Sequence, residues 1–201
     1  TLLLLTNGNA VSQALFKSLP YDPVNDFAMI STVGYFSLVI VTGAKSPYRS
    51  IKDVIAAAKA SPGKLNIGTI SPGGTQHLAG ELFRSTAGID ALVVPHKTTG
   101  EVIIGVRNGS LDIGVDFIAP LVAAVKAGDM RALAVSAGKR FPGLPEVPTV
   151  IEAGVAGYDD EVDSCDRLVK NGQQGCCPAD GQSASRACGI SPRRPTASTW
   201  R

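Results

Sequence analysis

The hydrophobic pattern between Ser37 and Ala137 alternates short aliphatic or β-branched runs with stretches of helical periodicity. Five runs predict strands and the four stretches between them predict helices, an order typical of βα units around a parallel sheet. Such a unit buries both faces of its sheet, so residues 37 to 137 are expected to form one complete lobe. The predicted strands cover residues 38 to 42, 65 to 70, 91 to 94, 111 to 117 and 131 to 135.

Local signals mark where these four helices begin and end. Ser50 with Asp53 three residues later predicts a capping box for the first helix, and Ser61-Pro62-Gly63 stops it. Pro120 fits the first turn of the last helix. Glycines are expected to end the other three helices: Gly88, Gly109 and Gly128.

The segments on either side of this lobe predict parts of another one. Residues 1 to 36 predict a strand (Thr1 to Leu5), a helix (Ala10 to Leu19) and a strand near Phe27 to Val33, and we expect them to be a partial first lobe joined through residues 34 to 37. Residues 138 to 161 are expected to return the chain to that first lobe. The chain opens without an initiator Met or an export leader, so we expect a fragment whose beginning is missing.

The composition changes after Glu161. All four cysteines lie beyond residue 160, in a segment rich in Gly, Ser, Pro and Arg with few aliphatic residues. We therefore expect residues 162 to 201 to be disordered, or to be a tail translated out of frame. Adjacent Cys176 and Cys177 do not fit the spacing of a zinc site, and in an exported protein the four cysteines would allow three disulfide pairings.

Bulk composition narrows the class of protein. The 201 residues are 44% hydrophobic with a formal net charge of +2, which is ample for a packed core. Basic residues are scattered, so no surface for nucleic acid is expected. The aliphatic run from Leu2 to Leu5 is far shorter than the roughly 20 residues of a membrane-spanning helix. We expect a soluble globular protein with a small partner and no stable membrane insertion.

The segment from Gly68 to His77 carries the strongest candidate chemistry. It follows a predicted strand and opens a predicted helix, so backbone N–H groups near Gly74 to Gln76 should point outward unpaired. Together with the helix dipole they favour a carboxylate or a phosphate, and two glycines let that anion approach the backbone. A tight turn capped by Thr75, without any ligand, fits the same residues equally well.

Nucleotide and hydrolase chemistry fit the sequence less well. Gly68 and Gly73 have the spacing of a P-loop, but Gly74 stands where a P-loop needs Lys. No G-x-G-x-x-G follows a strand, so we expect no dinucleotide and no other cofactor. Ser136, within Ala134 to Gly138, only approximates the G-x-S-x-G elbow of serine hydrolases.

Three further polar residues are candidates for the site. His77 and His96 each lack a companion acid at metal or triad spacing, so polar lining or surface positions are expected for both. Asp116 interrupts an apolar strand at the carboxyl edge, where open α/β sheets bind ligands. The alternative for Asp116 is a cap for the helix at Pro120.

Several runs, taken in order, resemble the motifs of one known family. They are residues 19 to 23, 68 to 83, 94 to 97, 131 to 135 and 144 to 154, which together span about residues 1 to 160. The family is the extracytoplasmic solute-binding proteins of tripartite tricarboxylate transporters, called Bug or TctC-like. His96 stands where the family more often has Tyr.

The resemblance implies a fold and a function. The fold is α/β and periplasmic-binding-protein-like (type II, Venus flytrap), with one complete parallel-sheet lobe here plus a partial second one. The function is capture, in the periplasm, of a small carboxylate (dicarboxylate, tricarboxylate or acidic amino acid) for delivery to the membrane subunits of the transporter. A monomeric receptor with no metal, no cofactor and no enzymatic activity is implied.

The family grips its ligand with two glycine-containing loops, one from each lobe, through backbone amides and water. The second-lobe loop corresponds to residues 71 to 77, and the first-lobe glycine loop has no counterpart in this sequence. A first-lobe strand end that faces the cleft corresponds to Thr6 and Asn7. The implied ligand-binding residues, with Asp116 added from its place in the sheet, are Ser71, Gly73, Gly74, Thr75, Gln76, His77, Asp116, Thr6 and Asn7.

Two other functions stay open at this point. The inducer-binding domain of a LysR-type transcriptional regulator resembles such a lobe and also binds small anions, but it requires a DNA-binding helix-turn-helix upstream. An α/β enzyme using Ser136 or His77 ranks last, because no nucleophile, base and acid converge in the sequence.

Overall fold

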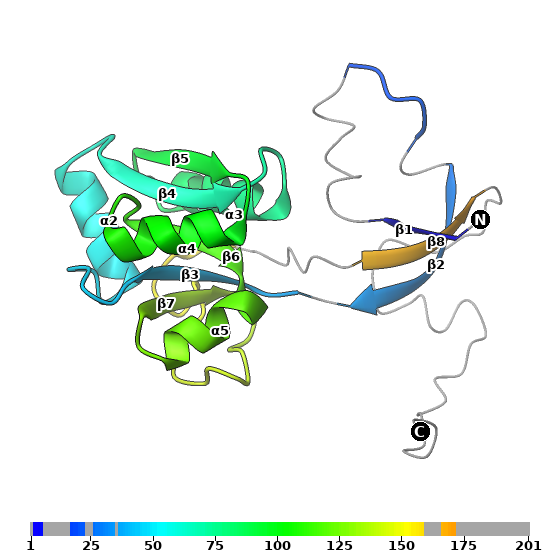
Figure 1. Ribbon diagram of the computed structural model, residues 1–201. Helices are drawn as coiled ribbons and strands as arrows, with labels where there is room; N and C mark the ends of the chain where they lie inside the picture. Colours follow the sequence, from blue (N-terminus) through cyan, green and yellow to red (C-terminus); the bar gives the residue numbers. More distant parts are fainter. Residues whose placement is uncertain (1, 6–16, 23–25, 35, 159–165, 172–201) are drawn as a thin grey trace, which may run out of the picture.

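The computed structural model describes residues 2–5, 17–22, 26–34, 36–158 and 166–171. These residues contain a five-stranded sheet and a three-stranded sheet. In Figure 1 the five-stranded sheet carries all the labelled helices, and the three-stranded sheet stands apart from it. We call the five-stranded part with its helices the second lobe, and the three-stranded part the first-lobe sheet.

The sheet of the second lobe has the order β5-β4-β6-β3-β7. All five predicted strands are confirmed, and β4 runs parallel to β5 and β6 as expected. β3, however, is antiparallel to both of its neighbours, β6 and β7, so the expectation of an entirely parallel sheet is wrong for this strand. The reason is that the chain enters the lobe at the edge where β6 and β7 end, with Leu38 paired to Phe117 and Ser136. The strands are β3 (Leu38–Gly43), β4 (Leu65–Ile70), β5 (Ala91–His96), β6 (Ile113–Phe117) and β7 (Met130–Ser136).

Two helices cover each face of this sheet. Alternate residues of β3 divide between the faces, because Ile40 packs into one core cluster and Val41 into the other. Phe83 of α3 is fully buried on the first face and Leu121 of α5 on the second, and burying such a side chain contributes about 1.5–3 kcal/mol. The helices are α2 (Ile51–Ala60) and α3 (Thr75–Thr86) on the first face, and α4 (Thr99–Asn108) and α5 (Ile118–Lys126) on the second.

The predicted helix ends are confirmed. At α2 the Ser50 hydroxyl accepts from the N–H of Asp53 at 3.3 Å, and the Asp53 carboxylate accepts from the N–H of Ser50 at 2.9 Å. α4 begins in a similar way, because the Thr98 hydroxyl accepts from the N–H of Glu101. Positive φ angles of 59°, 81° and 78° follow the other three helices, at Gly88, Gly109 and Gly128.

Residues 138–158 belong to the core of the second lobe. Leu144 and Val147 pack with α4 and α5, whereas Val150, Val155 and Tyr158 pack with α2 and α3. These residues therefore complete the second lobe, a role that the sequence did not predict for the segment expected to return to the first lobe. They wrap around β7, the outermost strand on one side of the sheet, where the N–H of Val150 donates to the carbonyl of Val135 at 3.0 Å.

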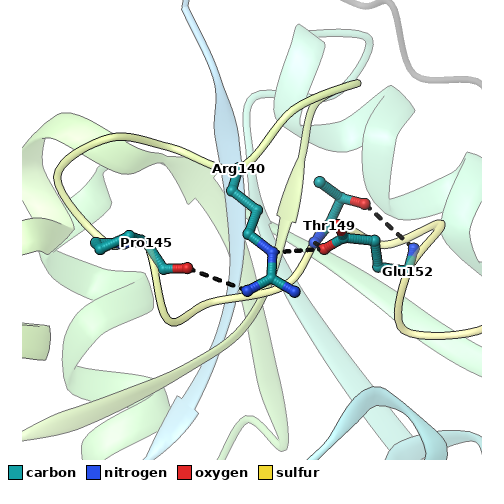
Figure 2. Close-up of polar contacts among 4 residues, drawn as sticks. All are labelled: Arg140, Pro145, Thr149 and Glu152. Atoms are coloured by element: carbon teal, nitrogen blue, oxygen red, sulfur yellow. Dashed lines mark hydrogen bonds and ion pairs between the residues drawn. The ribbon is translucent and has the colours of Figure 1, made fainter.

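Figure 2 shows how this wrapping segment holds itself together. The Glu152 carboxylate accepts from the N–H of Thr149 at 3.0 Å, and the N–H of Glu152 donates to the Thr149 hydroxyl at 3.2 Å. The Arg140 guanidinium adds an ion pair to Glu152 at 2.8 Å and reaches the carbonyl of Pro145 at 3.1 Å. The N–H of Thr149, followed by Arg140, lowers the pKa of the Glu152 carboxyl.

The first-lobe sheet consists of β1 (Leu2–Leu5), β8 (Asp166–Asn171) and β2 (Phe27–Gly34), with β8 in the middle and antiparallel to both neighbours. The strands predicted near both ends of residues 1 to 36 are confirmed. The prediction of a disordered tail is wrong for residues 166–171, which form β8. This segment lacks the alternating hydrophobic pattern of a strand, and it becomes one by pairing with β1 and β2 on its two sides. The rest of the tail, all four cysteines and residues 10 to 16 of the expected first helix lie outside the described residues, and residues 17–22 contain no helix or strand.

Candidate functional site

The predicted second-lobe site residues gather at one edge of the five-stranded sheet. Residues 71–74 form the loop that follows β4 directly, residues 75–77 are the first turn of α3, and Asp116 is the penultimate residue of β6. The Nε2 atom of Gln76 donates to Oδ1 of Asp116 at 3.2 Å, which joins α3 to β6. Because β4 and β6 are parallel, their carboxyl ends share this edge, the usual place for ligands in open α/β sheets.

The same edge receives the chain that crosses from the first-lobe sheet. β3 follows β2 directly, and its first residue, Leu38, pairs with the last residues of β6 and β7. The rings of Phe36 and Phe117 meet edge to face beside it, with centroids 5.9 Å apart. The predicted site residues therefore lie on the side of the second lobe that the crossing chain reaches (Figure 1). Thr6 and Asn7, the predicted first-lobe residues, lie outside the described residues.

The loop before α3 is a tight and strained turn. The N–H of Gly74 donates to the carbonyl of Ser71 at 2.8 Å, and the N–H of Ser71 donates to the carbonyl of His96 at 3.1 Å. Ser71 has φ +46° and Gly73 has φ +75°, and Ser71 is the one non-glycine residue with positive φ in the described part of the chain. For a residue with a side chain this conformation costs about 1–2 kcal/mol. The expectation of an unpaired amide is therefore wrong at Gly74, whose N–H closes the turn.

The amides just after Gly74 are different. Gly74 is the N-cap of α3, in extended conformation, and no side chain caps this helix. Within the described residues, the N–H groups of Thr75, Gln76 and His77 in the first turn of α3 have no acceptor. Thr75 is the first residue inside the helix and only 9% exposed, so the alternative in which it caps the helix is wrong. A Cβ at position 74 would lie 3.0 Å from the carbonyl oxygen of Ser71, so glycine keeps this terminus compact.

Asp116 has no exposed surface. Its Oδ1 atom accepts from the N–H of Phe117 at 2.7 Å and from Gln76, while its Oδ2 atom has no partner among the described residues. The N-cap of α5 is Phe117, and no side chain caps that helix, so Asp116 does not cap the helix that contains Pro120. A buried carboxylate oxygen without a hydrogen bond is uncommon and calls for an explanation.

The remaining candidates are not brought together into a catalytic set. His77 and His96 are half-buried, and the His96 ring is 3.1 Å from the carbonyl of Val94. Ser136 is buried, and its Oγ lies 2.8 Å from the hydroxyl of Tyr158. Tyr158 also donates to the carbonyl of Ala79 in α3 at 3.5 Å, so it ties the wrapping segment to the helix of the candidate site. Sequence reasoning missed Tyr158; the apolar residues spaced along positions 144–158 were the signal that this segment is buried.

Neither of the two cavities described in the second lobe coincides with this site. One of about 310 Å³ is lined by Tyr48, Arg107 and Asp112, among others, and one of about 300 Å³ by residues that include Met130 and Val147. Burial, followed by the nearby Asp112 carboxylate, raises the pKa of Tyr48 in the first of them. Among the described residues, no group of three or more His, Cys, Asp or Glu could hold a metal ion, and no helix is long and apolar enough to cross a membrane.

The chain is similar to known proteins in both sequence and structure. The model of one family, described as "Tripartite tricarboxylate transporter family receptor", matches residues 1–164. The protein BugT of Bordetella pertussis is 31% identical over 155 residues, which are 76% of this chain and 48% of BugT. The chain spans about half the length of the curated relatives it matches.

Two solved structures are similar as well. The periplasmic binding protein BugD superposes with a TM-score of 0.73 at 25% identity, covering 85% of this chain and 56% of that one. An R. palustris protein solved with adipate superposes with a TM-score of 0.71 at 29% identity, covering 84% of this chain and 56% of that one.

Proposed function

Because this chain belongs to the tripartite tricarboxylate transporter receptor family, we propose that it forms part of an extracytoplasmic receptor that captures a small carboxylate and releases it unchanged. The resemblance drawn from the sequence motifs is confirmed by the family match, and the periplasmic-binding-protein-like fold by the similar solved structures. The family is one of receptors, which favours binding over catalysis and over the LysR-type regulator.

The observation that carries the proposal is the open amino terminus of α3. Three first-turn N–H groups have no acceptor in the described part of the chain, and at the positive end of a 12-residue helix they attract an anion. Gly74 carries no side chain that could occupy the same space, and the strained Ser71 holds the turn in place. Ser71, Gly73, Gly74, Thr75, Gln76 and His77 are therefore the proposed second-lobe contacts.

A carboxylate is the proposed anion because a similar protein from R. palustris was solved with adipate. Two carboxylate oxygens match a fan of two or three helix-terminal N–H groups. A receptor of this kind works in the periplasm and hands its ligand to membrane subunits of the transporter, and we propose both for this protein from its family.

The proposed mechanism is closure of two lobes around the ligand. The second lobe supplies the fixed amides of α3, and the chain that crosses from the first-lobe sheet enters at the same end of the strands, so we assign the covering of the bound carboxylate to the first lobe. Thr6 and Asn7 are proposed to face the ligand from that side. Covering the site removes water, which strengthens each hydrogen bond between amide and carboxylate. A monomer suffices for this cycle.

Isothermal titration of the 201-residue chain with adipate and succinate tests the proposal, with the corresponding uncharged diamides as matched controls. We expect saturable binding of a diacid, no binding of its diamide, and recovery of the diacid unchanged after prolonged incubation. Equal binding of acid and amide would refute the anion site, and conversion of the acid would refute a receptor without catalysis.

A further inference from the structure

Asp116, whose Oδ2 atom has no partner among the described residues, is linked through its other oxygen to the proposed carboxylate site. Asp116 is joined by one hydrogen bond, 3.2 Å long, to the side chain of Gln76, and Gln76 is the second residue of α3. The buried carboxylate and the open amides are thus one side-chain length apart. A buried acceptor without a hydrogen bond destabilises the folded protein, and a charged acceptor does so more than a neutral one.

Asp116 also fixes the polarity of Gln76. A carboxylate only accepts hydrogen bonds, so the amide of Gln76 must turn its nitrogen toward Asp116 and its carbonyl oxygen, Oε1, away from it. Gln76 is half-buried, whereas Asp116 has no exposed surface. Of these two residues, only Gln76 is exposed enough to contact a ligand at the first turn of α3, and its side-chain nitrogen is held by the Asp116 carboxylate.

We propose that Gln76 and Asp116 form an accepting subsite beside the open amides of α3, and that the preferred ligand carries a hydroxyl or ammonium group on the carbon next to its carboxylate. The carboxylate takes the N–H groups of Thr75 to His77, and the neighbouring donor takes Oε1 of Gln76. Asp116 is the positioning residue, because it orients the amide and its charge favours a donor or a cation. This inference rests on the proposed function and narrows its ligand class to hydroxy and amino acids.

An unsubstituted carboxylate fits this arrangement less well. It places a methylene group against Gln76 and leaves Oε1 of Gln76 without a donor. A site built to hydrogen-bond a particular group discriminates strongly against the analogue that lacks it. The expected preference is therefore at least about ten-fold for the substituted acid over the plain acid of the same length, which corresponds to a single good hydrogen bond.

Titration of the 201-residue chain with two matched series tests the inference: succinate, malate and aspartate, and glutarate, 2-hydroxyglutarate and glutamate. The wild-type chain should prefer the hydroxy or amino acid within a series. Asp116→Asn keeps the shape but allows a donor where Oδ2 was, and it should reduce the preference to less than about three-fold. Gln76→Met should do the same. Asp90→Asn removes an equal charge from an exposed residue at the start of β5, the opposite edge, and should leave the preference intact.

The outcomes separate the two proposals. A purely structural role for Asp116 would weaken all members of a series equally and leave their ratio unchanged, which would overturn the inference. Equal binding of all three acids by the wild-type chain would also overturn it, while the receptor function would stand. Absence of binding to every acid in both series would overturn the receptor function itself and the inference with it.

Discussion

Two helices of the second lobe, α2 and α3, begin in opposite ways. At α2, Ser50 and Asp53 satisfy each other's backbone N–H groups, and Asp53 takes the N–H of Arg49 as well. At α3 the N-cap is a glycine, and no side chain caps the first turn. α4 begins at the same edge of the sheet as α3 and is nevertheless capped by Thr98, so position at this edge alone does not leave a helix open. α5 also begins there without a side-chain cap, but its first N–H, that of Ile118, donates to the carbonyl of Ser37 at 3.0 Å. The difference supports the proposal that α3 leaves its amides for a ligand, whereas α2 and α4 use theirs for stability.

The largest effect is expected from closing α3 in the manner of α2. Gly74→Asp places a carboxylate where it accepts the first-turn N–H groups and repels an incoming anion. A hydrogen bond to a charged group contributes about 1.5–3 kcal/mol, so losing two of them should weaken carboxylate binding at least about 100-fold. Titration with the tightest-binding diacid measures the loss.

Gly74→Ala is the matched control for this change. Gly74 has φ −75°, which suits any residue, but the new Cβ meets the carbonyl oxygen of Ser71 at 3.0 Å in either variant. Alanine therefore reproduces the crowding without the carboxylate, and it should lower affinity much less than aspartate does. Equal losses in the two variants would mean that crowding, not occupation of the amides, governs binding, and the contrast between α2 and α3 would lose its functional meaning.

A smaller effect is expected from opening α2 in the manner of α3. Ser50→Ala removes the acceptor for the N–H of Asp53 and should lower the free energy of unfolding by about 1 kcal/mol, the usual contribution of an N-cap side chain. Urea unfolding measures this loss, and Ser50→Thr, which retains a hydroxyl, should recover most of it. Carboxylate affinity should not change, because α2 begins at the opposite edge of the sheet from α3. A loss of affinity in Ser50→Ala would show that the two termini do not have separate roles.

The closed termini were also easier to predict from the sequence than the open one. Ser50 and Asp53 are three residues apart, and the capping box they form depends only on local backbone geometry. The capping box at α2 was therefore predicted correctly. At α3 the glycines predicted an open terminus. The hydrogen bond from the N–H of Gly74 to the carbonyl of Ser71, however, depends on the positive φ of Ser71, and a serine in the sequence does not predict a positive φ. The bond between Gln76 and Asp116 joins residues 40 positions apart and depends on the parallel pairing of β4 with β6.

Long-range pairing also explains the errors in the fold. β8 is a strand because β1 and β2 flank it, and its own sequence carries too few apolar residues to predict one. β3 is reversed because of where the chain enters the lobe, which the strand and helix order does not specify. Tyr158 was missed because its partners, Ser136 and Ala79, lie 22 and 79 residues away. Local signals thus predicted the helices and strands. Contacts between distant residues determined the direction of β3, the pairing of β8 and the contacts around the candidate site.

The smallest effect concerns pH, and it sharpens the same contrast. The N–H of Arg49, followed by the Ser50 side chain, lowers the pKa of the Asp53 carboxyl in the folded protein. A lowered pKa means that Asp53 stabilises the fold fully above its unfolded pKa of about 3.9 and loses this contribution as the pH falls through the folded value. Stability of the wild-type chain should therefore exceed that of Asp53→Asn at pH 6, and the gap should close as the pH falls below about 4. α3 has no acidic residue in its first turn, so no carboxylate there makes the stability of the wild type depend on pH. Gly74→Asp should add such a dependence, with stability again lost as the pH falls. Thermal unfolding of the three proteins between pH 6 and 3 measures both gaps, and a gap that widened toward low pH would contradict the capping role of either carboxylate.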